Sequence, residues 1–171
     1  MESTSDAAAD IDAAIDAGYA ARDRDNMTPT IEYFTDLLAA HPGNAAVLYE
    51  LAGSYDTAGE EATAESLYLR AFDAGLSGER RRRALLQYGS TLRNLGRNQD
   101  SLAVFEKART EFPDSDSLRV FHAMSLHAAG SVSTALAECL LLIADRLGTD
   151  EIARYYAAIR GNAEYLASLE S

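Results

Sequence analysis

Three histidines and one cysteine are the first candidates in this chain for a nucleophile, a general base or a metal ligand, since its plentiful aspartates and glutamates usually form a solvated face. His122 and His127 lie five residues apart, and on a helix that spacing turns their side chains about 140° away from each other. Cys139, the sole cysteine, could pair with His122 as a nucleophile and base, but a lone buried cysteine is usually inert. His41 precedes Pro42 in a predicted loop. We therefore predict no catalytic residue, no metal site and no cofactor, and expect that the protein is not an enzyme.

Composition excludes two further classes of function. The 171 residues carry a net charge of -12, whereas nucleic-acid binding and attachment to an anionic membrane surface require a basic face. The sequence contains no phosphate-binding or dinucleotide-binding glycine motif. The first residues have neither the basic nor the apolar region of a secretory signal, and one cysteine allows no internal disulfide, so we expect a cytoplasmic location.

The arginine run Arg80–Arg83 is the most unusual local feature. Basic charge at the start of a helix opposes the helix dipole and therefore calls for compensation. One interpretation is a contact with an acidic or phosphorylated partner. The other is pairing within the chain, whose acidic residues outnumber its basic ones by 27 to 15.

The chain repeats itself with spacings of 34, 37 and 34 residues. A column of small residues, a column of turn residues and a column of aromatic residues share this phase: Gly18, Ala52, Gly89 and Ala123; Asp25, Gly59, Gly96 and Gly130; Phe34, Tyr68, Phe105 and Cys139. Repeats of this length stack into a continuous core, because one helix pair is too small to bury its own apolar face. We place Cys139 in the buried aromatic column, where a thiol acts as a small apolar group.

Each unit reads as two helices. Leu48, Leu51, Ala52 and Tyr55 follow the spacing of one helical face, and Gly59 then ends the pattern as a left-handed turn residue would. A second face with the same spacing follows from Ala64 to Ala71. Three extra residues, 79–81, explain the 37-residue step and predict an extra turn at the start of the fifth helix.

These units resemble the tetratricopeptide repeat, and the second unit, with its Leu51-Ala52, Gly59 and Tyr68, matches best. The usual tryptophan is missing from every unit. The resemblance covers four repeats, 11–44, 45–78, 82–115 and 116–149, and implies an all-α, right-handed α-solenoid of antiparallel helix pairs. Residues 150–169 are predicted to form a capping helix, with Gly161 as a candidate interruption, residues 1–5 to be disordered, and residues 6–171 to form a single domain.

The resemblance also implies a protein–protein interaction module that binds a peptide or protein segment in a concave groove formed by the first helix of each repeat. The residues expected to line the groove are Asp16, Tyr19, Tyr49, Glu50, Arg83, Leu86, Gln87, Arg93, Val120, Phe121, Met124 and His127. This lining is acidic at its N-terminal end, carries two arginines at its centre and is apolar at its C-terminal end, which suits a partner with basic and apolar residues. Phe121 and Val120 either contact the partner or pack against a neighbouring helix.

Within this family, co-chaperone repeats hold the C-terminal carboxylate of a chaperone with lysine, asparagine and arginine side chains. The corresponding positions here are Ile15, Tyr19, Glu50, Arg83 and Gln87, of which only the arginine fits. Carboxylate clamping of that kind is therefore disfavoured. The alternatives to an adaptor are a self-assembling homodimer and, less favoured, an enzyme; nothing in the sequence names the partner.

Overall fold

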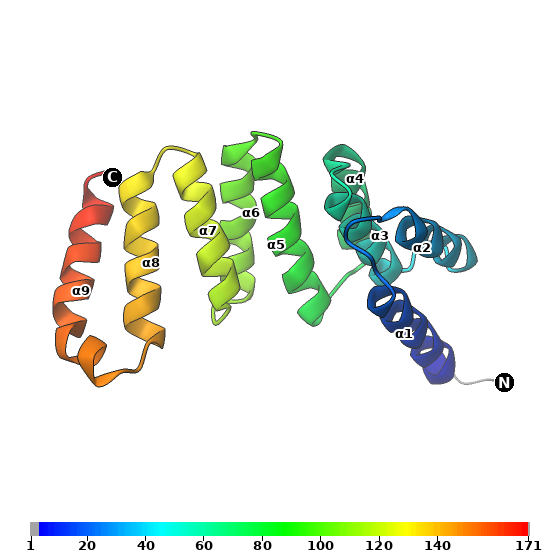
Figure 1. Ribbon diagram of the computed structural model, residues 1–171, viewed down its shortest axis with the longest axis horizontal. Coiled ribbons are helices and arrows are strands. Elements are labelled where there is room, and N and C mark those ends of the chain that lie inside the picture. The colour runs from blue at the N-terminus through cyan, green and yellow to red at the C-terminus, as the bar shows by residue number, and fades with distance from the viewer. Residues whose placement is uncertain (1–3, 171) are drawn as a thin grey trace. The chain divides into compact units, whose positions relative to one another are not determined.

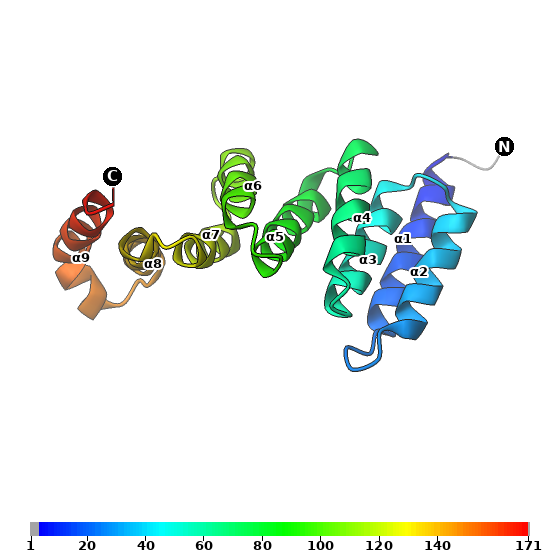
Figure 2. The ribbon, with the colours of Figure 1, turned by 90° about the horizontal axis from the view of Figure 1, so that it is seen from above.

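The computed structural model describes residues 4–170, with side chains from residue 9 onward, and this part of the chain is built from α-helices with no strand. The helices follow one another in antiparallel pairs, as Figures 1 and 2 show, which confirms the all-α prediction. Their bounds are α1 Thr4–Ala20, α2 Thr28–Ala40, α3 Ala45–Thr57, α4 Glu61–Asp73, α5 Gly78–Asn94, α6 Asn98–Glu111, α7 Asp116–Ala128, α8 Val132–Arg146 and α9 Asp150–Ser168.

The chain divides into two compact units, Met1–Ala84 (unit 1) and Leu85–Ser171 (unit 2), and each is described by itself. The sequence predicted one domain over residues 6–171, whereas the boundary between the units falls within α5. Of the segment predicted to be disordered, residues 1–3 lie outside the described residues, and Thr4 and Ser5 open α1.

Glycines end the first helix of a repeat where the sequence predicts them. Gly59 has a φ of +80°, in the left-handed region that a residue without a Cβ adopts most easily. The Glu60 amide then donates to the Tyr55 carbonyl at 2.9 Å, which closes the helix end. Asp25 stands at this place in the first repeat, where the chain follows a longer connection from residue 21 to residue 27 instead.

The small residues of the repeat let an aromatic ring of the second helix lie directly on the backbone of the first. A Cβ built on Gly89 would come within 2.6 Å of the Phe105 ring, and one on Gly18 within 2.8 Å of the Phe34 ring. Phe105 has no exposed surface, so the ring has no space into which it can retreat. The predicted column of small residues therefore has a steric cause.

The extra turn predicted before the third repeat is present, because α5 has 17 residues where α3 and α7 have 13. Its arginines pair within unit 1. Arg80 donates to Asp12 at 2.8 Å, and both Arg82 and Arg83 donate to Glu79. The Arg81 guanidinium lies 5.4 Å from the centre of the Phe72 ring. These contacts favour the intramolecular interpretation of the run.

A helix, α9, stands where the sequence predicts the capping helix, and it runs through Gly161 without interruption. Thr149 caps its start by accepting a hydrogen bond from the Ile152 amide at 3.3 Å. None of the described helices is both long enough and apolar enough to cross a membrane.

Two glycine substitutions test the steric role of the small column. Gly89→Ala adds a methyl group against the Phe105 ring, and we expect it to lower the free energy of unfolding by about 1–3 kcal/mol through overpacking. The matched control is Gly161→Ala, also within a helix but in open space, which should raise the free energy of unfolding by up to about 1 kcal/mol. Urea unfolding followed by circular dichroism measures both, and equal stabilisation by the two changes would contradict the steric account.

Candidate functional site

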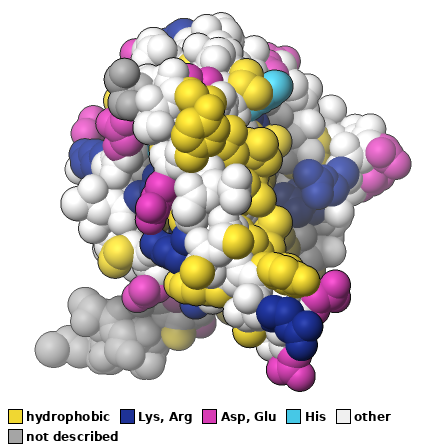
Figure 3. All heavy atoms as spheres, turned by 90° about the vertical axis from the view of Figure 1, so that its left-hand side faces the viewer, with side chains coloured by type: hydrophobic (Ala, Val, Ile, Leu, Met, Phe, Trp, Pro, Cys, Tyr) yellow, Lys and Arg dark blue, Asp and Glu magenta, His cyan; other side chains and the backbone are white. Residues whose placement is uncertain are grey.

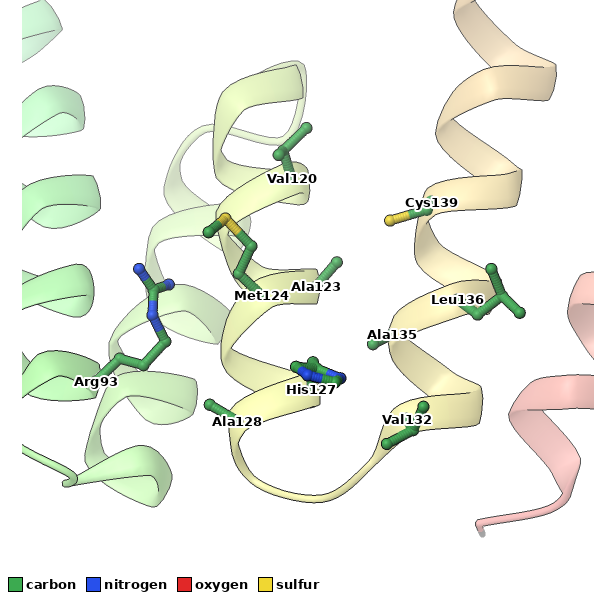
Figure 4. Close-up of a pocket in the computed structure, with 10 residues that line it drawn as sticks. All are labelled: Arg93, Val120, Ala123, Met124, His127, Ala128, Val132, Ala135, Leu136 and Cys139. Carbon is green, nitrogen blue, oxygen red and sulfur yellow. The ribbon is translucent and has the colours of Figure 1, made fainter.

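An open hollow of about 600 Å³ lies in unit 2, between the facing sides of α7 and α8 and the end of α5. We refer to it as the apolar hollow, and Figure 4 shows its side chains. Its lining is almost wholly apolar and contains no carboxylate, although the chain as a whole is strongly acidic. The residues that form it are Arg93, Val120, Ala123, Met124, His127, Ala128, Val132, Ala135, Leu136 and Cys139.

The hollow exists because the fourth repeat lacks the aromatic ring that fills this place in the others. Phe34, Tyr68 and Phe105 are buried in the first three repeats, and Cys139 holds the same column in the fourth. The sequence predicted a buried thiol, but Cys139 is exposed. A thiol is much smaller than a ring, so an open space remains beside Cys139 and above Ala123, which is itself only 3% exposed.

Helix α9 does not close the hollow. In unit 1 the next helix along the chain, α3, packs on both α1 and α2, whereas in unit 2 the described residues of α9 pack on α8 and not on α7. Polar contacts hold α9 there. The Glu170 carboxylate accepts hydrogen bonds from the Ser133 and Thr134 amides at 2.8 and 3.0 Å, which caps the start of α8. Arg160 pairs with Asp145 at 3.1 Å.

Arg93 stands at one side of the hollow without an acidic partner. Its guanidinium donates to the Ser125 hydroxyl at 3.5 Å, and no carboxylate among the described residues lies within ion-pair distance. Burial lowers the pKa of this half-buried group, because the apolar surroundings disfavour its charge. The other half-buried arginines of unit 2 differ from it: Arg109 pairs with Glu138, and Arg119 and Arg160 pair with Asp145.

Some of the residues predicted to line the C-terminal part of the groove line the apolar hollow, and others do not. Val120 and Met124 are exposed by 39% and 46%, and together with His127 and Arg93 they line the hollow. Phe121 is half-buried and lies outside the lining, so α7 is rotated by about one residue from the expected facing. Leu86 and Gln87 are half-buried on α5 and also lie outside it.

In unit 1 the predicted lining is not uniformly accessible. Tyr49 is only 4% exposed and belongs to the core, which corrects its assignment to the groove. Asp16, Tyr19 and Arg83 are exposed, and Glu50 is half-buried. Burial raises the pKa of the Glu50 carboxyl, and the nearby Arg80, Arg22 and Arg83 oppose that effect. The N-terminal end is therefore mixed in charge, and not simply acidic as predicted.

The half of the hollow that the second helix contributes was not predicted from the sequence, namely Val132, Ala135, Leu136 and Cys139 of α8. The resemblance implies a groove formed by the first helix of each repeat, whereas α8 is a second helix. The sequence feature that indicates this space is the cysteine at position 139, in a column that is otherwise aromatic, because the loss of a ring from a packed layer leaves a space.

In the described part of the chain, Cys139 and His122, the pair considered for catalysis, are not brought together. The hollow contains Cys139 but not His122, which is buried on the other side of α7. Arg109 donates to His122 Nδ1 at 2.7 Å, so the neutral ring carries its proton on Nε2. Among the described residues, no group of three or more histidine, cysteine, aspartate or glutamate side chains could hold a metal ion.

His122 makes the stability of the protein depend on pH. Burial, and then the charge of Arg109, lower the pKa of its imidazole, while Glu138 and Glu106 act in the opposite direction. The unfolded chain takes up a proton near pH 6.5 and the folded chain only at lower pH, so the unfolded state binds more protons in between. The free energy of unfolding should therefore fall as the pH drops below about 6.5, by at most about 1.4 kcal/mol per pH unit.

Urea unfolding between pH 7.5 and 5.5 measures this slope. His122→Gln keeps an acceptor for Arg109 but does not titrate, and we expect a flatter profile. His127→Gln, which replaces an exposed histidine on the same helix, should keep the wild-type slope. An unchanged slope in the His122 variant would contradict this assignment.

Comparison with protein families identifies the repeat. The family model described as Tetratrico peptide repeat matches residues 45–166, which is well over half of the 171-residue chain. The matched segment includes α3–α8 and most of α9, and so contains every α7 and α8 residue that lines the apolar hollow. No curated protein matches the sequence at a significant level.

Proposed function

The chain belongs to the tetratricopeptide repeat family, and we propose that it binds another protein through the apolar hollow of unit 2. Tetratricopeptide repeats are generally protein–protein interaction modules, and proteins of this family are generally scaffolds without catalytic activity. We assign that general role to a particular surface. The protein is then an adaptor or scaffold that recognises a protein segment.

The observation that carries the proposal is the exposure of large apolar side chains around one hollow. Val120, Met124, Val132 and Leu136 are each exposed by between 39% and 52% and line the same space. A contiguous apolar surface of this kind is unfavourable in water and commonly marks an interaction site. Hydrophobic side chains also form a band on the α9 side of the molecule, as Figure 3 shows.

The properties of the lining suit a segment of a partner protein. Met124 has an unbranched, polarisable side chain that adapts to different partner shapes. Apolar side chains of two helices face each other across the hollow, so a segment laid between them would contact both. The residues of unit 1 are weaker candidates, because several of the charged groups there already pair with one another.

Self-assembly is the second candidate, and the tyrosines of α9 favour it. Tyr155, Tyr156 and Tyr165 are exposed, and tyrosine is enriched in protein interfaces. A homodimer formed through α9 would leave the hollow free. Light scattering at tens of micromolar protein would detect such a dimer directly.

A charge reversal in the hollow tests the proposed function. Met124→Glu places a carboxylate among apolar groups that the partner must cover, and we expect capture of the partner from lysate of the source organism to fall about tenfold or more. Leu69→Glu is the matched control, since Leu69 has a similar exposure of 44% in unit 1. Circular dichroism should show both variants folded.

Three outcomes are informative. Partners lost by the Met124 variant and kept by the Leu69 variant would support the hollow as the site. Partners kept by both variants would contradict the proposal. If the wild type and both variants capture only further copies of this chain, self-assembly through another surface would be favoured.

A further inference from the structure

The apolar hollow is the place where a repeat of this protein otherwise keeps its aromatic ring. In the third repeat the Phe105 ring lies so close to Gly89 that a Cβ there would be 2.6 Å away, and the ring is completely buried. Ala123 and Cys139 occupy the same two columns in the fourth repeat. There the small residue is present and buried, the ring is absent, and the Cys139 side of the space is open to solvent.

The walls of this space suit a flat apolar group. The small, buried side chains of Ala123 and Ala135 form its floor, and the exposed thioether of Met124 and thiol of Cys139 border it, as Figure 4 shows. Sulfur groups make favourable contacts with aromatic rings, frequently at the ring edge. An aromatic side chain also buries more apolar area than an aliphatic one, about 150–250 Å².

The charge of the site is positive, in contrast to the chain as a whole. No carboxylate lines the hollow, and Arg93 is the half-buried arginine of unit 2 that has no acidic partner among the described residues. A guanidinium that has lost part of its water gains most from a carboxylate, which accepts two hydrogen bonds in the same plane. The complementary ligand is therefore anionic as well as apolar.

We propose that the hollow receives an aromatic side chain of a partner segment, which takes the place of the missing ring of the fourth repeat, and that a neighbouring carboxylate of the same segment pairs with Arg93. The partner is thus a segment in which an aromatic residue lies close to an acidic one. This inference rests on the proposed function and adds the chemistry of the ligand. It also reverses, for this site, the expectation of a basic partner.

The smallest probe with both features is 3-phenylpropionate, and 3-phenylpropan-1-ol is its uncharged counterpart. Methyl-¹³C-methionine spectra follow binding, because Met124 lines the hollow whereas the buried Met27 serves as an internal control. We expect millimolar binding of both probes that shifts the Met124 signal alone. Arg93→Gln should weaken the acid about three- to tenfold and leave the alcohol unchanged, because only the acid has a charge to pair.

A second measurement fills the hollow in the folded protein. Benzyl methanethiosulfonate converts the Cys139 thiol, the only one in the chain, to a benzyl disulfide and releases methanesulfinate, so the added ring can enter the space. We expect the labelled protein to lose 3-phenylpropionate binding and partner capture, and a reducing agent to restore both. The matched control is methyl methanethiosulfonate, which adds no ring and should impair binding far less.

The inference fails if Arg93→Gln weakens the acid and the alcohol equally, or if the benzyl-labelled protein still binds 3-phenylpropionate. Either result is distinguishable from failure of the proposed function. If Met124→Glu abolishes partner capture while the benzyl label leaves it intact, the surface binds a partner but not through an aromatic residue in this space. If Met124→Glu leaves capture intact, the hollow is not the site and the proposed function itself fails.

Discussion

The close approach of an aromatic ring to a small residue is the contact on which each repeat depends. In the third repeat it brings α5 and α6 together at Gly89 and Phe105. The Ser101 hydroxyl, buried beside them, donates to the Gly89 carbonyl at 2.6 Å and lies 2.8 Å from the Ser125 hydroxyl of α7. One small residue thus allows the ring to be buried and a polar link to form to the next repeat. A bulkier side chain at that point would separate all three helices.

The fourth repeat keeps the small residue but lacks the ring, and its packing differs accordingly. The helices α7 and α8 still pair, because their other apolar residues, such as Leu118 and Ala137, remain buried. The space between them is no longer filled from within. Since α9 is held along α8 by Glu170 and Arg160, the chain does not fill that space from outside either. The openness of the hollow therefore results from one substitution and one helix position together.

The parts of this structure that repeat were predictable from the sequence, and the parts that depend on a single helix rotation or position were not. Periodicity located every helix pair, the turn at Gly59 and the longer α5, because steric and turn requirements recur with each repeat. It did not show that Tyr49 is buried or that Val120, and not Phe121, faces the hollow, since a rotation of one residue decides both. Nor did it show that α9 leaves α7 uncovered, which depends on the side-chain contacts of Glu170 and Arg160.

The unpaired charge of Arg93 is best understood against the excess of acidic residues in this chain. With 27 acidic and 15 basic residues, a partner for an arginine is easily available, and the other half-buried arginines of unit 2 have one. An ion pair within the chain would offset the free energy of desolvating the Arg93 guanidinium. Without such a pair, that desolvation is not compensated in the free protein. A carboxylate of a bound partner would compensate this desolvation only in the complex. The interaction would therefore add to the affinity without first breaking an existing ion pair. For the same reason Arg80, Arg82 and Arg83, which already pair with carboxylates, make a weaker site for an acidic ligand.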